Sequence, residues 1–426
     1  MMSSRTANGD ADRDGDAQGA STPATSKMEA KPVSGWLIMF LAVACGLIAA
    51  NLYYSQPLVG PISAELGLSP RAAGLIVTMT QVGYGIGLLL IVPLGDLFEN
   101  RRLIITVIAL GGLALLASGL ATTPGTFLAA SLFIGIGSVA VQILVPFAAH
   151  LASDATRGRI VGNVMSGLMF GIMLSRPVSS FLTELTNWRV VFFASTAMMV
   201  VLMIAVRLVL PVSRPHVRPH YFELLGSMAR LMITSRILRR RALYQASLFA
   251  AFSLFWTTVP LLLAGPDFNM SQAGIALFAL AGAAGAVAAP IGGRMADRGW
   301  MRPATAIAMA SVPFALMLTH LGDMGSGFSL LVLVAGAVML DFGLTCNMVL
   351  GQRAIFSLGA AYRNRINGVY MATFFAAGAV GSALGGWAFA HGGWMLSTAV
   401  GAVFPALGLL YYLSEYIRPL DLPKAD

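Results

Sequence analysis

Apolar residues form long runs along most of the chain, and short polar connections separate these runs. Each run has about 20 mainly apolar residues, the length that an α-helix needs to cross the hydrocarbon core of a bilayer. The pattern therefore predicts an all-α integral membrane protein with twelve transmembrane helices. The predicted spans are 34–54, 73–95, 103–122, 125–152, 159–183, 189–211, 243–264, 270–293, 303–321, 327–350, 366–390 and 394–415.

Two of these segments leave the helix count open. The stretches 281–293 and 376–390 are rich in Gly and Ala and less apolar per residue, so counts of ten or eleven are the main alternatives. Small residues let helix backbones approach closely in lipid, where no hydrophobic force drives helices together. We therefore retain twelve helices.

The composition agrees with a membrane protein. Of the 426 residues, 57% are hydrophobic and 11% are charged, whereas a soluble domain carries roughly 25% charged residues. The net charge of +9 does not indicate a nucleic-acid partner, because the basic residues form short scattered clusters instead of one stripe. Cys45 and Cys346 lie in separate apolar segments, so we expect neither a disulfide framework nor a metal site.

The basic residues are distributed unevenly between the two predicted sides of the membrane. With twelve spans, all of the 27 Lys and Arg residues except Arg71, Arg176 and Arg189 lie on the side of the two termini. The positive-inside rule then places both termini in the cytoplasm. We interpret the largest basic group as a topology signal that contacts lipid headgroups. It comprises Arg236, Arg239, Arg240 and Arg241.

The pattern also predicts the domain organisation. Residues 1–33 are poor in large apolar side chains and lack the order of a signal peptide, which predicts a disordered cytoplasmic tail. We expect an N-terminal six-helix bundle at 34–211, a basic cytoplasmic linker at 212–242, a C-terminal six-helix bundle at 243–415 and a cytoplasmic tail at 416–426.

The two predicted bundles carry related sequences. "RGRIVGNVM" begins at Arg157 and "RNRINGVYM" begins at Arg363, and the same offset aligns Trp188 with Trp394. A second pair, "VPLGDLFENRR" and "GRMADRGWMR", follows the second and the eighth predicted helix. Two repeats of six helices that enclose a site near the membrane midplane are a common plan of transporters.

These motifs resemble the major facilitator superfamily, whose loop between helices two and three has the pattern G-x-L-A-D-R-x-G-R-K. Leu94, Gly95 and Asp96 occupy the L-A-D positions, and Arg101 with Arg102 supplies the basic end. The sequence departs from the pattern where Val92, Leu97 and Glu99 replace Gly, Arg and Gly, and the second copy keeps Gly293, Ala296, Asp297 and Arg298. "NLYYSQPL" at 51–58 further resembles bacterial exporter-like members, which implies the bacterial inner membrane.

The resemblance implies a role for the charged loop residues. Asp96, Arg101 and Arg102, with the weaker copy Asp297 and Arg298, are expected to latch the outward-facing conformation. A carboxylate at a helix end can pair with an Arg, and a contact made in only one conformation shifts the population towards it. The alternative is that these charges only fix the topology.

Two charged residues lie inside predicted spans. Arg176 interrupts "GLMFGIMLSRPVSSFL", and Asp341 lies in "AVMLDFGLTCNMVL". An ionised side chain near the bilayer centre costs about 2.5 to 3.5 kcal/mol on insertion scales, so it usually faces a cavity or a partner. The resemblance places helices five and ten beside a central cavity. We therefore expect Arg176 to face this cavity, where it binds an anionic group or balances Asp341.

The two charges suit different tasks. Arg176 holds its proton too firmly to carry protons, but it provides a fixed charge and a two-pronged hydrogen-bond donor. Asp341 can gain and lose a proton, so we hypothesise that it couples transport to the proton gradient. The alternative is a static ion pair that only fixes helix packing.

Further polar and aromatic residues are candidates for the lining of the cavity. Each of them alone is also typical of helix–helix contacts or of interfacial anchoring. They are Tyr53, Tyr54, Gln56, Gln81, Tyr84, Gln142, Gln245, Trp256, Asn347 and Tyr370.

The first function that the sequence predicts is proton-coupled export of small organic molecules by a secondary transporter that needs no cofactor, with a monomer as the default state. The second is uptake or exchange of an anionic metabolite, with Arg176 holding its carboxylate. Superfamily exporters that exchange cargo for protons typically have a Gly-Pro pattern on helix five. Here Ser175, Arg176 and Pro177 depart from that pattern. A membrane enzyme is disfavoured, because the spans offer no phosphate loop, metal cluster or nucleophile with a base. A sensor is disfavoured, because neither the tail nor the linker has the length that we expect of an output domain.

Overall fold

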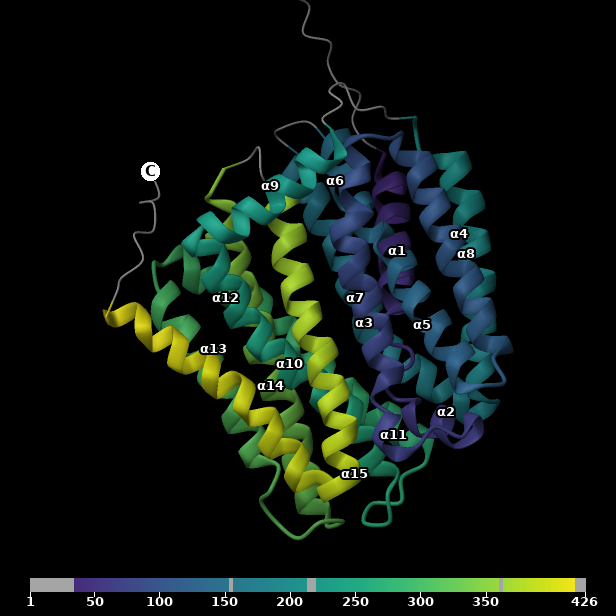
Figure 1. Ribbon diagram of the computed structural model, residues 1–426, viewed down its shortest axis with the longest axis vertical. Coiled ribbons are helices and arrows are strands. Elements are labelled where there is room, and N and C mark those ends of the chain that lie inside the picture. Colours follow the sequence, from purple (N-terminus) through teal and green to yellow (C-terminus); the bar gives the residue numbers. More distant parts are fainter. Residues whose placement is uncertain (1–33, 153–155, 213–219, 360–362, 418–426) are drawn as a thin grey trace, which may run out of the picture. The chain divides into compact units, whose positions relative to one another are not determined.

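The computed structural model describes residues 34–152, 156–212, 220–359 and 363–417, and all regular elements in these ranges are helices (Figure 1). The predicted tail at 1–33 lies outside the described residues, as does most of the predicted tail at 416–426.

The N-terminal half of the chain forms α1 to α8. Its elements are α1 Gly35–Ala50, α2 Val59–Leu66, η1 Pro70–Ala72, α3 Leu75–Leu90, η2 Val92–Asp96, α4 Asn100–Leu120, α5 Pro124–Ser138, α6 Ala140–Leu151, α7 Arg157–Leu185 and α8 Trp188–Val209. The connecting helix is α9 Tyr221–Thr234. The C-terminal half comprises α10 Arg236–Ala264, α11 Gln272–Ala279, η3 Leu280–Val287, α12 Ala288–Asp297, α13 Met301–Leu318, α14 Gly327–Phe356 and α15 Arg363–Ile417.

Twelve membrane crossings account for these helices. Nine stretches of the described chain are helical, long and apolar enough to cross a bilayer. The last of them, Arg363–Glu415, breaks at Gly392 and Gly393 and makes two crossings. The shorter α1 and the segment α11–η3–α12 supply the other two. The predicted all-helical fold with twelve transmembrane helices is confirmed.

The connection between the halves differs from the prediction. Residues 221–234 form the helix α9, and α10 begins at Arg236, before the predicted start at 243. Ser235 ends the connection because its side chain accepts a hydrogen bond from the Leu238 amide, the usual cap of a helix start. The run of arginines that indicated a polar loop therefore forms the first turns of a transmembrane helix.

Glycine decides two features of the packing. Gly393 has φ +58, a left-handed conformation that other residues adopt only with strain, and it breaks α15 between the last two crossings. Gly135 on α5 lies against α3 so closely that a Cβ there would come within 2.0 Å of the Thr80 carbonyl oxygen. Small residues thus set the distance between these helices, as packing in lipid favours.

The two halves make their most extensive contacts along two helix pairs. α3 lies along α15, and α7 lies along α11. Thr78 Oγ1 and Ser382 Oγ are 2.8 Å apart across the first pair, and Ser180 Oγ donates to the Gln272 carbonyl oxygen (2.8 Å) across the second. We call the end of the helices that carries α9 and the η2–α4 turn the linker face, and the end that carries α2 and the start of α11 the opposite face (Figure 1).

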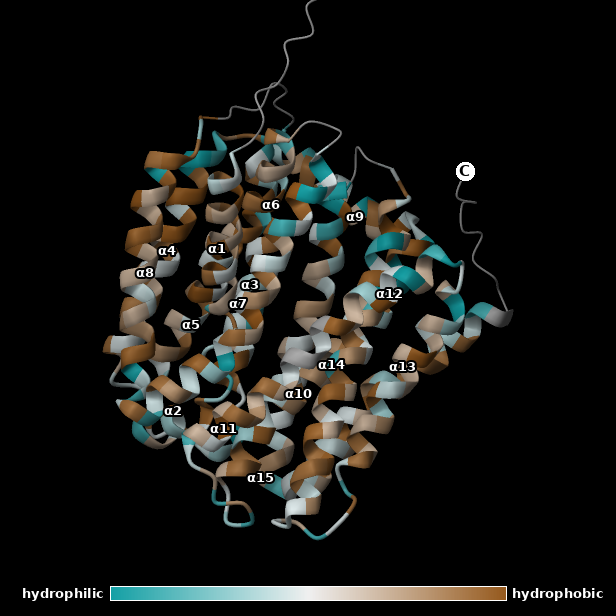
Figure 2. Ribbon diagram, turned by 180° about the vertical axis from the view of Figure 1, so that it is seen from behind, coloured by the Kyte–Doolittle hydropathy of each residue, from teal (hydrophilic) through white to brown (hydrophobic). Residues whose placement is uncertain are grey.

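The outer surface of the helices is apolar. In Figure 2 brown, hydrophobic residues run along α4 and α8, and teal, hydrophilic residues gather towards the ends of the helices. Large apolar side chains such as Leu113 on α4 and Val201 on α8 are exposed. Such a surface suits a hydrocarbon surrounding.

The internal repeat predicted from the sequence has a structural counterpart. The two related segments begin α7 at Arg157 and α15 at Arg363. Trp188 opens α8, and Trp394 follows the Gly392–Gly393 break, so each Trp begins the last crossing of its half.

Candidate functional site

A buried cation lies in the middle of α7, which runs beside α1 and meets the C-terminal half at α11. The Arg176 side chain is only 4% exposed. Its Nε donates a hydrogen bond of 2.7 Å to Oε1 of Gln56, in the turns that follow α1. Gln56 is itself fully buried. A residue in the turns after the first crossing thus fixes the orientation of the guanidinium on the fifth.

Three aromatic rings surround the Arg176 guanidinium. Its central carbon lies 4.2 Å from the ring centre of Trp256, 5.2 Å from that of Phe252 and 5.3 Å from that of Tyr53. A cation over an aromatic face gains about 2 kcal/mol or more when both are desolvated. Trp256 and Phe252 are four residues apart and therefore on one face of α10. The rings offset part of the cost of burying the charge.

Asp341 on α14 contacts the same tryptophan. Trp256 Nε1 donates a hydrogen bond of 3.0 Å to Oδ1 of Asp341, which is 6% exposed. Gly282 and Gly285 of η3 form the other wall, because a Cβ at Gly282 would come within 2.7 Å of Asp341 Oδ2 and one at Gly285 within 2.8 Å of Asp341 Cβ. The elements α10, η3 and α14, which belong to the seventh, eighth and tenth crossings, therefore meet at this carboxylate.

Trp256 stands between the two buried charges. Its ring faces the Arg176 guanidinium, and its N–H binds Asp341. Among the described residues no direct ion pair joins Arg176 and Asp341, although each acts electrostatically on the other. We call Arg176, Gln56, Tyr53, Trp256 and Asp341 the central cluster.

Two donors of the central cluster have no protein acceptor. Arg176 Nη2 and Gln56 Nε2 are both buried, and neither forms a hydrogen bond within the described part of the chain. Leaving a buried donor unsatisfied costs about 1 to 3 kcal/mol, and more for a charged group. These two buried donors therefore mark a position where a ligand would supply the missing acceptor.

The other predicted lining residues divide into smaller contacts. Gln81 Nε2 donates to Ser253 Oγ (2.6 Å) across the halves, and Gln142 Nε2 donates to Tyr84 Oη (3.0 Å). Asn347 Nδ2 donates to Gln245 Oε1 (2.7 Å) inside the C-terminal half.

Two candidates lie apart from these contacts. Tyr370 is fully buried, and its Oη has no partner among the described residues. A Cβ at Gly351 would come within 2.6 Å of that oxygen, so α14 walls it in. Tyr54 is half-buried and packs against the apolar core.

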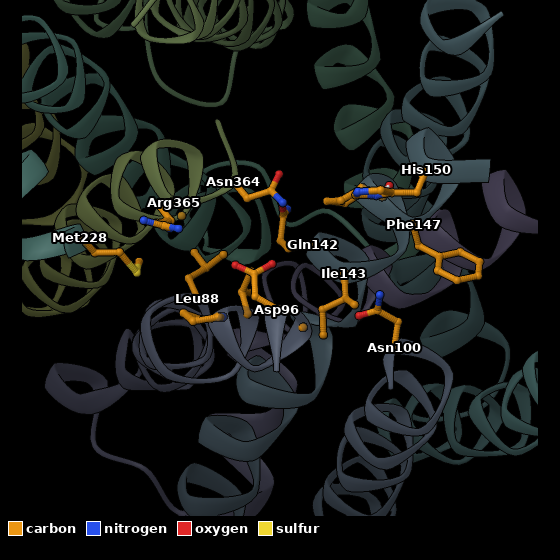
Figure 3. Close-up of a pocket in the computed structure, with 15 residues that line it drawn as sticks. Leu88, Asp96, Asn100, Gln142, Ile143, Phe147, His150, Met228, Asn364 and Arg365 are labelled. Atoms are coloured by element: carbon orange, nitrogen blue, oxygen red, sulfur yellow. The ribbon is translucent and has the colours of Figure 1, made fainter. Parts of the chain in front are cut away.

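A pocket of about 60 Å³ opens near the linker face. It lies where the end of α3, α6, α9 and the start of α15 meet, and Figure 3 shows the Asp96 carboxylate pointing into it. Arg365 and His150 act electrostatically on this carboxylate from the two halves of the chain. The pocket is lined by Leu88, Val92, Pro93, Gly95, Asp96, Asn100, Gln142, Ile143, Pro146, Phe147, His150, Met228, Asn364, Arg365 and Gly368.

The remaining predicted latch residues have local partners. Glu99 forms ion pairs with Arg102 at 2.9 Å and with Arg101 at 3.6 Å, and Arg101 Nη1 also donates to the Leu210 carbonyl oxygen. Asp297 pairs with Arg353 at the end of α14, whereas Arg298 follows α12 as an exposed side chain. The latch role itself stays a prediction.

The basic group at the start of α10 corrects one expectation. Arg240 and Arg241 are 5% and 1% exposed, so the interpretation as headgroup contacts is wrong for them. Arg240 pairs with Glu415 at 3.7 Å and lies over the Tyr411 ring. Arg241 Nη1 donates to Thr305 Oγ1 (2.8 Å). These arginines tie the seventh crossing to the twelfth and the ninth.

A polar cluster joins two connections at the opposite face. Glu65 accepts hydrogen bonds from Trp188 Nε1 (2.6 Å) and Arg189 Nε (2.9 Å). The bonds to Arg189 and Trp188 hold the pKa of the Glu65 carboxyl below its usual range. Arg189 also donates to the carbonyl oxygens of Gly119 and Ala121. One of the few basic residues on the predicted periplasmic side thus has a structural role.

Comparison with known proteins identifies the fold. The Major Facilitator Superfamily model matches residues 39–361. The chain belongs to the major facilitator superfamily. It is 39% identical over 384 residues to the uncharacterized transporter YgaY of Escherichia coli O157:H7, covering 90% of this chain and 96% of the relative. The probable transporter SCO4007 of Streptomyces coelicolor is 33% identical over 384 residues, covering 89% and 86%.

A solved structure gives the same fold. The nucleoside transporter NupG superposes with a TM-score of 0.72 at 14% sequence identity, over 89% of this chain and 99% of that one. As a superfamily member the chain is a multi-pass membrane protein and a transporter.

Several residues of the site escaped prediction. Phe252 and Ser253 carry no signal of their own within an apolar run, although their spacing from Trp256 could have indicated a shared face. Arg365 belongs to the repeated motif "RNRINGVYM" but was not predicted as a site residue, and neither was His150. The crossing of the two halves at the linker face brings both towards Asp96.

The superfamily loop allows a first test at Asp96. We expect Asp96→Asn to abolish transport and to leave the amount of protein in the membrane near normal, because the change removes the negative charge facing Arg365 and His150. Transport and surface amount are measured together, with Glu223→Gln on the exposed face of α9 as a control. Loss of membrane insertion would instead support a role in topology alone.

Proposed function

We propose that the chain is a secondary active transporter that couples the movement of small organic molecules to protons by alternating access. The observation that carries this proposal is the central cluster, in which a buried cation and a buried carboxylate lie where the two halves meet without pairing directly. Charges inside transmembrane segments usually mark substrate or proton pathways. A purely structural pair would gain more from direct contact.

In this proposal Asp341 carries the proton. Trp256 donates to Oδ1 of Asp341, and the backbone of η3 lies beside the other carboxylate oxygen, Oδ2. Arg176 stays charged at every physiological pH and supplies the fixed partner. Protonation of Asp341 therefore changes the net charge of the central cluster by one unit. This change alters the affinity for a charged substrate at Arg176.

The contacts between the halves support alternating access. Near the opposite face α7 and α11 are joined by Ser180 and Gln272, and Glu184 accepts a hydrogen bond from the Ala273 amide (3.1 Å). Near the linker face the small pocket around Asp96 lies between the same halves, and beside it Asn367 Nδ2 donates to Gln142 Oε1 (3.5 Å) from one half to the other. With the linker face in the cytoplasm, as its basic residues predict, we propose that this pocket is the cytoplasmic end of the cargo path. We propose that the two halves work as rigid bundles in a monomer within the bacterial inner membrane.

The direction of transport has two candidates. The exporter-like sequence at 51–58 favours export, which is the first candidate. Uptake or exchange of an anionic metabolite is the second, and the unpaired donors of Arg176 and Gln56 favour it. Both require the central cluster to face first one side and then the other.

A growth and uptake panel tests the proposal. Bacteria stripped of their own exporters express the chain and are exposed to drugs, dyes and organic acids, and labelled acids are followed into the cells. We expect at least one compound whose distribution depends on the chain, and a protonophore should abolish that dependence. Transport that persists with the protonophore and follows only the gradient of a second compound would contradict proton coupling.

A further inference from the structure

The two unpaired donors of the central cluster belong to two groups that one hydrogen bond joins, the Arg176 guanidinium and the Gln56 amide. In a guanidinium group Nε–H and Nη2–H point in the same direction, and this edge normally holds both oxygens of a carboxylate. On this edge of Arg176, the Nε–H donates to Gln56 Oε1. Arg176 Nη2 remains without an acceptor, and so does Gln56 Nε2 on the same amide group. A ligand oxygen beside the amide would be offered both N–H groups.

We infer that Arg176 and Gln56 bind the carboxylate of an organic anion, and that this anion and the proton on Asp341 bind together and travel in the same direction. The rings of Tyr53, Phe252 and Trp256 around the guanidinium suit a cargo with a flat apolar body next to its charge. The inference rests on the proposed function and decides between its two directions.

The coupling follows from the charges around Asp341. Among the described residues, the charged and titratable groups that act on it are Arg176 on α7 and Tyr53 after α1. The remaining neighbours are the Trp256 N–H on α10 and the glycine backbone of η3. With Asp341 ionised, its charge opposes a carboxylate at Arg176. With Asp341 protonated, the charge of Arg176 is available to the anion.

Linkage makes this effect reciprocal. If the proton strengthens anion binding, the anion strengthens proton binding by the same factor. Binding of the anion and the proton together is then favoured over binding of one of them alone. An inward proton gradient therefore drives uptake of the anion. A cationic cargo would compete with the proton for Asp341 and would be exchanged for it, so the sign of the charge decides the direction.

Matched probe pairs test the inference on the purified full-length chain. Benzoate with benzamide, and benzenesulfonate with benzenesulfonamide, differ within each pair in charge but little in shape. Binding is followed by Trp fluorescence and by thermal stability between pH 5 and pH 8. Benzenesulfonate stays ionised throughout, so any pH dependence of its binding belongs to the protein. The variants are Gln56→Leu, Arg176→Lys and Asp341→Asn, and Gln352→Leu replaces a partly buried amide away from the central cluster.

We expect the anions to bind at least about tenfold more tightly than the amides, and benzenesulfonate to bind about tenfold more tightly at pH 5 than at pH 8. Gln56→Leu and Arg176→Lys should each weaken anion binding at least about tenfold, whereas Gln352→Leu should not. At every pH, the Asp341→Asn variant should bind the anions with the affinity that the wild type has at pH 5. The melting temperature without probe shows that each variant is folded.

Two results would overturn the inference. Equal binding of anion and amide, or no binding of either anion, removes the carboxylate site. If benzenesulfonate binds more tightly at pH 8 than at pH 5, or equally at both, the claim that the anion and the proton bind together is refuted. If the expected binding occurs but vesicles show no proton movement with the anion, the proposed function fails while the anion site stands.

Discussion

Vesicles containing Asp341→Asn are expected to lose proton-driven accumulation of the cargo, to less than about one hundredth of the wild-type rate, while exchange of internal for external cargo continues. Asn cannot gain or lose a proton, but it keeps the shape of Asp and its contact with Trp256. The variant therefore resembles the permanently protonated state, which binds cargo and cannot release the proton. Accumulation under an imposed pH gradient and exchange at equal pH are measured on the same vesicles.

The matched control for this variant is Asp323→Asn, an exposed carboxylate in the connection between α13 and α14. We expect it to transport like wild type. Normal accumulation by Asp341→Asn would assign proton coupling to another residue, and loss of both accumulation and exchange would show that Asp341 serves cargo binding or folding instead.

Arg176→Ala is expected to reduce transport at least about 100-fold, because charge-assisted hydrogen bonds contribute about 1.5 to 3 kcal/mol each and the variant removes more than one. Arg176→Lys keeps the charge but loses the planar fork, so we expect an intermediate loss that shows mainly in the apparent affinity. Initial rates over a range of cargo concentrations separate affinity from turnover. Thermal stability of each purified variant verifies the fold.

Exchange of the two charges distinguishes a working cluster from a static pair. The double variant Arg176→Asp/Asp341→Arg preserves the net charge, and a pair that only fixed packing would tolerate it. We expect it to be inactive, because the cation would then lie on α14 and the carboxylate would face Gln56. Wild-type transport by the double variant would contradict both assigned roles.

The sequence predicted the number of crossings because each is a long apolar run with polar ends. It also singled out Arg176 and Asp341, since an ionised residue within such a run is costly and rare. Trp256 and Gln56 were only two among many polar or aromatic candidates. Their place in the central cluster depends on how helices of the two halves cross, which the pattern along one chain does not contain.

The start of α10 was misjudged for the same reason. Arg240 and Arg241 belong to a basic run that is typical of a cytoplasmic connection. Their burial depends on Glu415 and Thr305, which are distant in sequence and reach α10 only through tertiary packing. The irregular η3 was predicted as regular helix, because the Gly and Ala residues that bring its backbone to Asp341 also fit a transmembrane helix.

The proton movement that accompanies cargo tests the central claim most directly. Vesicles carrying the chain and a trapped pH indicator receive cargo outside at equal starting pH and zero voltage, with protein-free vesicles reporting passive leakage. The account predicts acidification of the interior that requires both the cargo and Asp341. Cargo entry without any change of interior pH, or the same change with Asp341→Asn, would contradict it.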